Sequence, residues 1–461
     1  MENKDIAFVL AKHVVDIIYD DIQKEAIENT KRSILDTLGV SVAGTKFDQG
    51  CRQVVELVKE AGGRQESSIL VFGGKVPAIM AGFAHGSMAH VLDYDDVVDD
   101  TIGHPTAAVL PGALAIAERV GGVSGKELIT AVVLGTDVNV RIALPVMKRG
   151  PYKSGWFPPT VFGYLGAAAT AGKLLGLNED QMADCLGIAF HQTAGSNELI
   201  SSGGVGITPL YPAFLAKAGV LSALMAQRGI TGIKDCLESK AGFYNLYFGG
   251  EYDSHYLTDK LGERFESINV GIKPWPTAVC THKFITAALD IVHDHNVSPE
   301  DVSEIIVHVS TFGQHLCEPL DERQRPNDFM GAGLSIPFTV ATAIAKGKVD
   351  IGSLVELRDE VTLEVAQKII PRYDPELDLP GIAPAVIDLE AKKGQMYSKR
   401  IDIAYGNPAN LMTMEDVLEK FQNCLSYSAK PFSKENMDRI IELILNLEDV
   451  DDVNEIIRLL C

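Results

Sequence analysis

The chain has 461 residues and a formal net charge of −21, with 46% hydrophobic and 22% charged residues. This is an ordinary globular composition with enough apolar side chain for a large core. So acidic a surface repels phosphate backbones, which argues against nucleic-acid binding. A small anionic substrate remains possible, because a few buried cations outweigh a distant, salt-screened surface charge.

The cysteines and the N-terminal residues indicate the compartment. There are seven cysteines, an odd number, and no C-x-x-C pair, so we expect neither a disulfide framework nor a cysteine zinc site. The N-terminal "MENKDIAFVLAKHVVDIIYDD" predicts an amphipathic helix instead of a signal peptide. No run approaches the ~18 apolar residues of a membrane span. We therefore expect a cytoplasmic protein that does not contact a membrane.

The chain up to about residue 265 predicts mostly helices. Apolar helices are expected at residues 126–146, 160–177 and 178–190. Ser124 and Asn178 stand where helix N-caps are expected. The second of these helices is rich in alanine and glycine, which suits close helix–helix contact. Helices that are apolar on most faces are buried by other helices, so this region predicts a large helical core.

The pattern changes after residue 265. Strand-like β-branched content appears in 266–276 and 304–310, and 385–403 predicts a hairpin that turns at Lys393 and Gly394. Helical stretches lie between them, and the chain is helical again at its end. The fold class expected is mainly α, with a large discontinuous helical domain (1–265 and 405–461) and a smaller α+β domain (266–404).

Residues 90–105, "HVLDYDDVVDDTIGHP", contain five aspartates and two histidines. Asp95 to Asp99 fits the D-D-x-x-D pattern that holds magnesium in helical enzymes, but that chemistry needs a second acidic motif. A zinc site from His85, His90 and Asp93 is disfavoured, because histidines five apart diverge on a helix. The sequence therefore predicts no metal here.

Acid/base chemistry is a second interpretation of this stretch. His90, Asp93 and Asp96 share one face if a helix over 78–96 continues that far. His104 precedes Pro105, which is well placed to begin the next helix. The third interpretation is a solvated acidic loop, and from these residues alone it is the favoured one.

Longer motifs resemble the MmgE/PrpD family. They are "HVLDYDD…HPTAAVLPGALAIAE", "GWFPPTVFGYLGAAATAGKLLGLNEDQMADCLGIA", "IKPWPTAVCTHKFITAALDIV" and "LSIPFTVATAIAKGKV". The resemblance covers nearly the whole chain and keeps the motif order. It implies a large helical domain with an α+β lid, a homodimer, and no metal or organic cofactor. It also implies proton movement at a carbon next to a carboxylate.

The resemblance places three active-site residues. Asp93 of "LDYDD", His104 of "GHP" and Lys273 of "IKPWP" fall where the family has its active-site aspartate, histidine and lysine. We expect Asp93 to hold His104, which exchanges the substrate proton, and Lys273 to hold developing negative charge. Asp99 and Asp100 are expected to be solvated.

Four positions depart from the pattern of the family's decarboxylases. Val97 replaces a threonine, Phe157 a histidine, Thr208 a lysine and Ala278 a histidine. Phe157, Thr208 and Ala278 are therefore expected to line the substrate site. The lost cation and imidazoles favour a less charged or more apolar substrate than a tricarboxylate.

Other residues nearby could replace the lost groups. Arg141, Lys217 and His191 are the candidates, although the first two could equally be outward charges. The glycine-rich 200–210 lacks the Gly-Lys-Ser/Thr end of a phosphate loop, and we expect a turn that lines the pocket.

The sequence thus predicts a cofactor-independent lyase acting on a small carboxylate. An epimerase or isomerase of a dicarboxylate with the same proton-transfer site is the first alternative. A non-catalytic, metabolite-binding dimer is the second.

Overall fold

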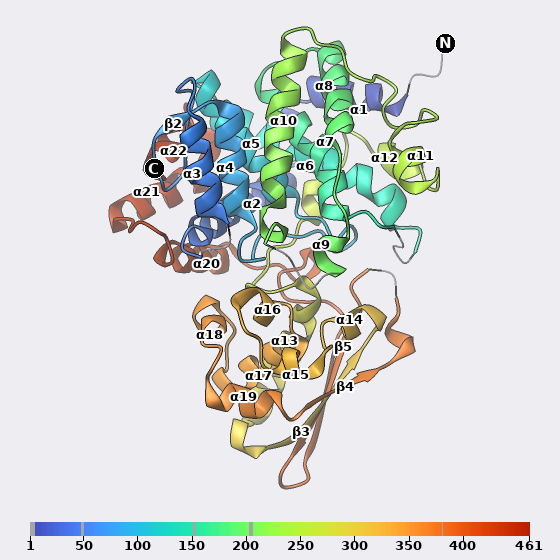
Figure 1. Ribbon diagram of the computed structural model, residues 1–461, viewed down its shortest axis with the longest axis vertical. Helices are drawn as coiled ribbons and strands as arrows, with labels where there is room; N and C mark the ends of the chain where they lie inside the picture. Colours follow the sequence, from blue (N-terminus) through green and yellow to red (C-terminus); the bar gives the residue numbers. More distant parts are fainter. Residues whose placement is uncertain (1–4, 48–49, 151–153, 202–205, 380) are drawn as a thin grey trace. The chain divides into compact units, whose positions relative to one another are not determined.

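The computed structural model describes residues 5–47, 50–150, 154–201, 206–379 and 381–461 (Figure 1). The chain divides into two compact units. The helical unit comprises residues 1–91, 95–270 and 413–461, and the mixed unit comprises 92–94 and 271–412. The predicted mainly helical class with a smaller α+β part is confirmed.

The helical unit contains fifteen α-helices and one two-stranded ribbon among its described residues. The helices are α1 Ile6–Asp16, α2 Lys24–Gly44, α3 Cys51–Ala61, α4 Ala78–Ala89, α5 Pro105–Val120, α6 Gly125–Met147, α7 Pro158–Leu174, α8 Glu179–Gln192, α9 Glu198–Ser201, α10 Tyr211–Gln227, α11 Phe243–Phe248, α12 His255–Thr258, α20 Met414–Ser426, α21 Lys434–Leu445 and α22 Asn454–Leu459. The ribbon pairs β1 Ser67–Ser68 with β2 Lys75–Val76. Although α20 and α2 are far apart in the sequence, they pack side by side.

The helix starts predicted at two caps are confirmed. The Ser124 side chain accepts a hydrogen bond from the Glu127 amide at the start of α6. Asn178 accepts one from the Gln181 amide at the start of α8. These side chains satisfy amides that a helix cannot pair internally, which fixes where each helix begins.

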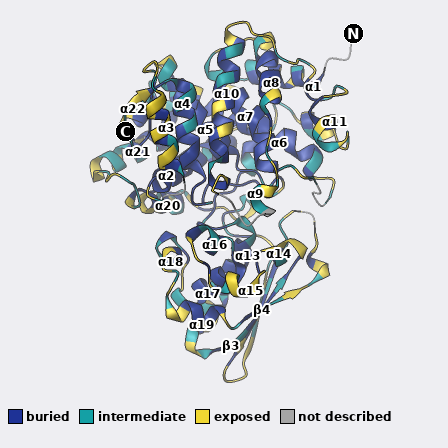
Figure 2. Cartoon of the chain, in the orientation of Figure 1, coloured by how far each residue is buried: buried dark blue, intermediate teal, exposed yellow. Residues whose placement is uncertain are grey.

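Small residues let the central helices approach closely. A Cβ atom on Gly166 of α7 would lie 2.6 Å from the backbone oxygen of Gly135 in α6, and one on Gly86 of α4 would lie 2.6 Å from the Ala213 backbone in α10. The crossing at Gly86 brings the end of α4 to the beginning of α10. Most residues of α5, α6 and α7 are buried (Figure 2).

Two helical segments are long and apolar enough to span a membrane, contrary to the expectation from run length. They are Gly125–Met147 and Thr208–Gln227, and 94% and 72% of their most apolar windows are buried inside the protein. Such burial is typical of core helices.

The mixed unit contains one four-stranded sheet with helices. Its strands, in the order β4-β3-β5-β6, are β3 Val302–Val309, β4 Ile369–Tyr373, β5 Ala385–Ala391 and β6 Met396–Ile401. Its helices are α13 Val279–His295, α14 Thr311–His315, α15 Leu320–Gln324, α16 Phe329–Gly333, α17 Ile336–Lys346, α18 Ile351–Val355 and α19 Glu360–Ala366. Alternate residues of β5 are buried, and α13 packs against β5 and β6.

The hairpin predicted in this unit is confirmed, and one predicted strand is wrong. β5 pairs antiparallel with β6, and Gly394 in the turn has φ 80°, which glycine adopts without a steric penalty. Residues 266–276 contribute no strand to the four-stranded sheet; Glu266–Asn269 forms a 3₁₀ turn instead. Their β-branched content reflects burial, since Val270 and Ile272 are both buried.

A buried ion network joins α1, α6 and the 3₁₀ turn. The Asp137 carboxylate contacts His13 Nε2 at 3.0 Å and accepts from Arg141 Nε at 2.9 Å and from the Glu266 amide at 2.8 Å. Burial alone would raise the pKa of Asp137, but His13, Arg141 and the Glu266 amide together hold it below its usual value. Arg141 is thus a fully buried structural cation, with further bonds to the Asp259 and Arg264 carbonyls.

We predict that Asp137→Asn lowers the free energy of unfolding by about 3 kcal/mol or more, because it removes the nearer of the two carboxylates that face the buried Arg141 guanidinium, and the other, Glu266, is 3.8 Å away. Urea unfolding at neutral pH measures the loss. Asp100→Asn is the control, since the Asp100–Lys148 pair is exposed and is worth less than about 1 kcal/mol.

The same network predicts how acid affects stability. The folded-state pKa of Asp137 lies below its unfolded value of about 3.9, so its contribution is present above that pH and is lost as the pH falls through the folded pKa. The stability difference between the native protein and Asp137→Asn should therefore shrink below about pH 4. A difference that is constant with pH would contradict this assignment.

Candidate active site

The acidic stretch is a folded-back loop between two helix ends. α4 ends at Ala89, so the helix does not continue to residue 96 and the condition for a shared face of His90, Asp93 and Asp96 is not met. His104 is the residue directly before α5. The Val98 amide donates to the Gly103 carbonyl at 2.9 Å and closes the loop. Asp93 and Ile102 have φ values of 48° and 54°. Left-handed backbone is rare for such residues and is enriched at functional sites.

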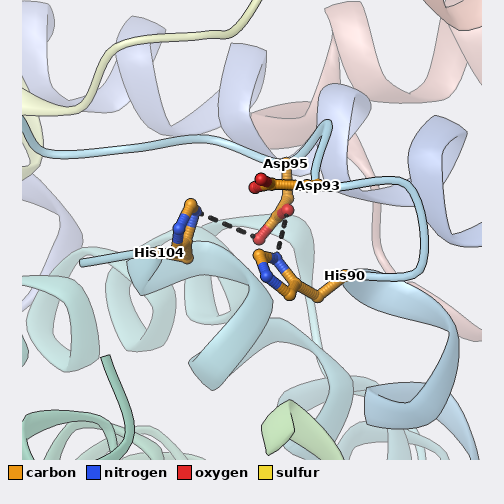
Figure 3. Close-up of side chains that lie close together, drawn as sticks. All are labelled: His90, Asp93, Asp95 and His104. Carbon is orange, nitrogen blue, oxygen red and sulfur yellow. Dashed lines mark hydrogen bonds and ion pairs between the residues drawn. The ribbon is translucent and has the colours of Figure 1, made fainter. Parts of the chain in front are cut away.

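Asp95, in this loop, lies between two imidazoles (Figure 3). Its Oδ1 is 2.7 Å from His90 Nδ1 and its Oδ2 is 3.4 Å from His104 Nδ1, and its side chain has no solvent exposure. The two rings are 4.7 Å apart between centroids. The loop is therefore not the solvated acidic loop that the residues alone favoured.

These contacts set the tautomer of His104. Its Nδ1 lies 2.7 Å from the Asp96 carbonyl oxygen, and a carbonyl only accepts, so Nδ1 carries the proton. In the neutral ring, Nε2 is then the nitrogen that can take up a proton. His104 can therefore act as a general base through Nε2, and the Asp95 carboxylate beside it can offset the charge of a protonated ring.

Asp96 has a structural role in the same loop. Its Oδ1 accepts from the Thr106 amide at 3.2 Å in the first turn of α5. The side chain is fully buried, and burial, with the Asp95 charge as a further contribution, raises its pKa well above the usual value. Asp96 therefore caps α5 with a side chain whose charged form is disfavoured by burial.

Aromatic side chains extend from the imidazoles. The Tyr211 ring, at the start of α10, meets the His90 ring edge-on at 4.9 Å, and the Phe157 ring meets Tyr211 at 5.5 Å. Phe157 is buried. Phe157, which stands where the family's decarboxylases have a histidine, therefore packs against Tyr211, and Tyr211 in turn packs against His90.

The predicted lysine and aspartate meet within the mixed unit. Lys273 Nζ donates to the Asp93 carbonyl at 2.8 Å and also to the Asp93 carboxylate. Lys273 is buried, and the neighbouring Tyr94 hydroxyl donates to the Pro274 carbonyl at 3.0 Å. A buried ammonium is thus held against a carboxylate. The predicted approach of Asp93 to His104 stays a prediction, because these side chains belong to different units.

The other predicted substrate residues have definite places. Thr208 is buried and its hydroxyl donates to the Leu199 carbonyl at 3.0 Å. Ala278 precedes α13, and its amide donates to the Gly333 carbonyl at 3.1 Å. Part of the glycine-rich turn, residues 202–205, lies outside the described residues.

The suggested replacement cations do not join the imidazoles. Arg141 belongs to the Asp137 network described above. Lys217 is exposed, with Nζ 5.6 Å from the Phe83 ring centroid, and His191 is exposed. None of the three replaces the lost family groups at this cluster.

His90 and Asp95 are the residues whose pairing the sequence analysis missed. On a continuing helix, His90 would share one face with Asp93 and Asp96. Once α4 ends at Ala89, the chain turns and Asp95 meets the ring instead. The available signal was Gly86 and Ser87, which are weak helix formers near the end of α4, but they do not fix which aspartate turns inward.

Three of these side chains could also hold a metal. The ligand atoms of His90, Asp95 and His104 lie within 4.8 Å of one another, and histidine with carboxylate suits several divalent metals. His85, considered earlier for zinc, instead contacts the carbonyls of Ser68 and Pro111. Because His104 Nδ1 donates to a carbonyl, hydrogen bonding accounts for the cluster without a metal.

Comparison with known proteins gives the same family over both units. Residues 9–255 match the MmgE/PrpD N-terminal domain, and residues 275–448 match the MmgE/PrpD C-terminal domain. The chain is 27% identical to the cis-aconitate decarboxylase of Homo sapiens, over 94% of this chain and 90% of that protein. It is 23% identical to the cis-aconitate decarboxylase of Aspergillus terreus, over 96% and 93%.

A further relative matches over part of the chain. The probable 2-methylcitrate dehydratase of Saccharomyces cerevisiae is 23% identical over 51% of this chain and 50% of its own length.

We predict that activity survives removal of divalent metals, because the nitrogen of His104 that faces Asp95 is occupied by its bond to the Asp96 carbonyl. Dialysis against EDTA followed by an assay measures this. Loss of activity that magnesium or zinc restores would show that the cluster is a metal site.

Proposed function

The chain is a lyase of the MmgE/PrpD family, and on that premise we propose that it acts on a small carboxylic acid without a cofactor. The reaction moves a proton at the carbon next to a carboxylate, with loss of water or of carbon dioxide. The observation that carries the proposal is the buried His104, whose Nδ1 proton is held by the Asp96 carbonyl while the Asp95 carboxylate lies 3.4 Å away.

The proton-transfer step follows from that tautomer. In a dehydration, His104 Nε2 takes the proton from the carbon, and the resulting imidazolium gives it to the departing hydroxide, which leaves as water. In a decarboxylation, the ring begins as the imidazolium and gives its Nε2 proton to the carbanion left by carbon dioxide. In both cases the buried Asp95 carboxylate, at 3.4 Å, offsets the charge of the imidazolium.

Lys273 supplies the positive charge that the chemistry needs. Removing a proton next to a carboxylate builds negative charge on the carboxylate oxygens, and a buried ammonium stabilises that charge. In the structure this ammonium is held by Asp93. We propose that a substrate carboxylate shares Lys273 with Asp93 during the reaction.

The substrate class follows from the side chains at the variable positions. Phe157 is buried in aromatic contact with Tyr211, and Thr208 is a neutral side chain. Compared with the family's decarboxylases, an aromatic side chain at position 157 and the loss of a lysine at position 208 make the site less cationic. Such a site favours an acid with two carboxylates, or with one carboxylate and an amide or apolar group.

We predict that His104→Ala lowers kcat by at least ~100-fold, because a positioned general base contributes about 10²–10⁴-fold. The assay follows uptake of solvent deuterium by NMR across a series of small di- and tricarboxylic acids. Asp100→Ala is the control. Asp100 lies in the same loop but is exposed and paired only to Lys148 among its described ion pairs, so kcat should change less than about threefold. Equal losses in the two variants would sink the assignment.

Thr208→Lys tests the substrate class. We predict that it lowers the KM for tricarboxylates, because it adds an ammonium that can pair with the extra carboxylate. The comparison is KM for citrate-like acids in the native and variant proteins, with Thr208→Met as the neutral control of similar length. Turnover of such acids at ordinary enzyme rates by the native protein would contradict the prediction.

A further inference from the structure

We infer that His90 is a positioning residue that acts on His104 through the carboxylate of Asp95. The inference rests on the proposed function, in which His104 exchanges the substrate proton. It assigns a task to the second imidazole of the cluster, which the proposed proton transfer does not use.

The distances give the direction of this effect. His90 Nδ1 is the nearer imidazole nitrogen to Asp95, at 2.7 Å, and His104 Nδ1 is the more distant, at 3.4 Å. A carboxylate without solvent stays ionised only while donors surround it. The His90 bond to Oδ1 therefore keeps Asp95 charged and turns Oδ2 toward His104.

The His90 ring is itself held in place. It stands directly after α4, whose crossing with α10 at Gly86 leaves no room for a Cβ atom. Tyr211, at the start of α10, contacts its ring edge-on. A fixed ring can present Nδ1 to one carboxylate oxygen, which is what a positioning residue must do.

The surroundings make Asp95 dependent on its donors. Within the helical unit, Asp96 lies beside it in the chain, and a carboxyl group offers Asp95 no positive charge; burial and the Asp95 charge raise the Asp96 pKa. Asp36 adds a further negative charge near Asp96, and it is paired with Lys420 at 2.5 Å. Tyr211 contributes a neutral ring. Without the His90 donor, Asp95 would take up a proton more readily and would stabilise the His104 imidazolium less.

The test replaces His90 with two amide side chains, each of which places a donor at the position of a different nitrogen of the His90 ring. In His90→Asn the amide nitrogen falls where Nδ1 was, and in His90→Gln it falls where Nε2 was. We expect His90→Asn to retain at least about a third of kcat and His90→Gln to lose at least ~10-fold, since loss of an imidazole-orienting contact is costly in other acid/base sites. The control is His85→Asn. His85 is a buried histidine within α4, and its described hydrogen-bond partners are backbone groups, so kcat should be unchanged.

A second measurement does not depend on activity. Nitrogen-15 spectra of histidine-labelled protein report whether Nδ1 or Nε2 of His104 carries the proton. We expect the native protein and both His90 variants to show the Nδ1–H form of the neutral ring, because the Asp96 carbonyl holds that proton. We expect the doubly protonated ring to be less populated in His90→Gln than in the other two proteins at the same pH, because Asp95 then stabilises its charge less. This readout distinguishes positioning from a general loss of stability, and it applies to any variant that folds.

The outcomes separate this inference from the proposed function. If His104→Ala loses activity while His90→Gln matches the native protein in kcat and in the His104 spectrum, only the role of His90 is wrong. If His104→Ala is fully active, the proposed function itself is wrong. Equal losses in His90→Asn, His90→Gln and His85→Asn would show that α4 tolerates no change, and would overturn the assigned Nδ1 contact.

Discussion

The candidate active site depends on one buried carboxylate. Asp95 has no solvent exposure, and a charge in such a place persists only with donors arranged around it. The two imidazoles beside it stand at helix ends, one directly after α4 and one directly before α5. The end of α4 and the beginning of α5 therefore determine where the two imidazoles lie relative to Asp95.

The packing of the helices sets those positions. Close crossings at Gly86 and Gly166 allow α4 to approach α10, and α7 to approach α6, until backbone meets backbone. The same approach delivers Tyr211 to the edge of the His90 ring. A bulkier residue at Gly86 would separate the helix end from α10, so the small residue there supports the site as well as the core.

The two units contribute different parts of the proposed chemistry. The helical unit holds the imidazoles and Asp95, and the mixed unit holds Lys273 with Asp93. Asp93 and Asp95 are only two residues apart in the chain, so the loop covalently links the two sets of groups. A protein with an acidic surface can thus still offer a buried ammonium to an acid substrate.

The sequence by itself determined the fold class, most of the elements and the chemistry to expect. Caps at Ser124 and Asn178 and the turn at Gly394 were predictable because their signals act within a few residues. Only the tertiary structure decided which aspartate faces the histidines, because that depends on where α4 ends and on the helices that surround the loop. It likewise decided that Arg141 is a structural cation, since its partner Asp137 also binds His13, far away in the sequence. Local patterns determine secondary structure, whereas burial and charge pairing depend on neighbours that the sequence does not place side by side.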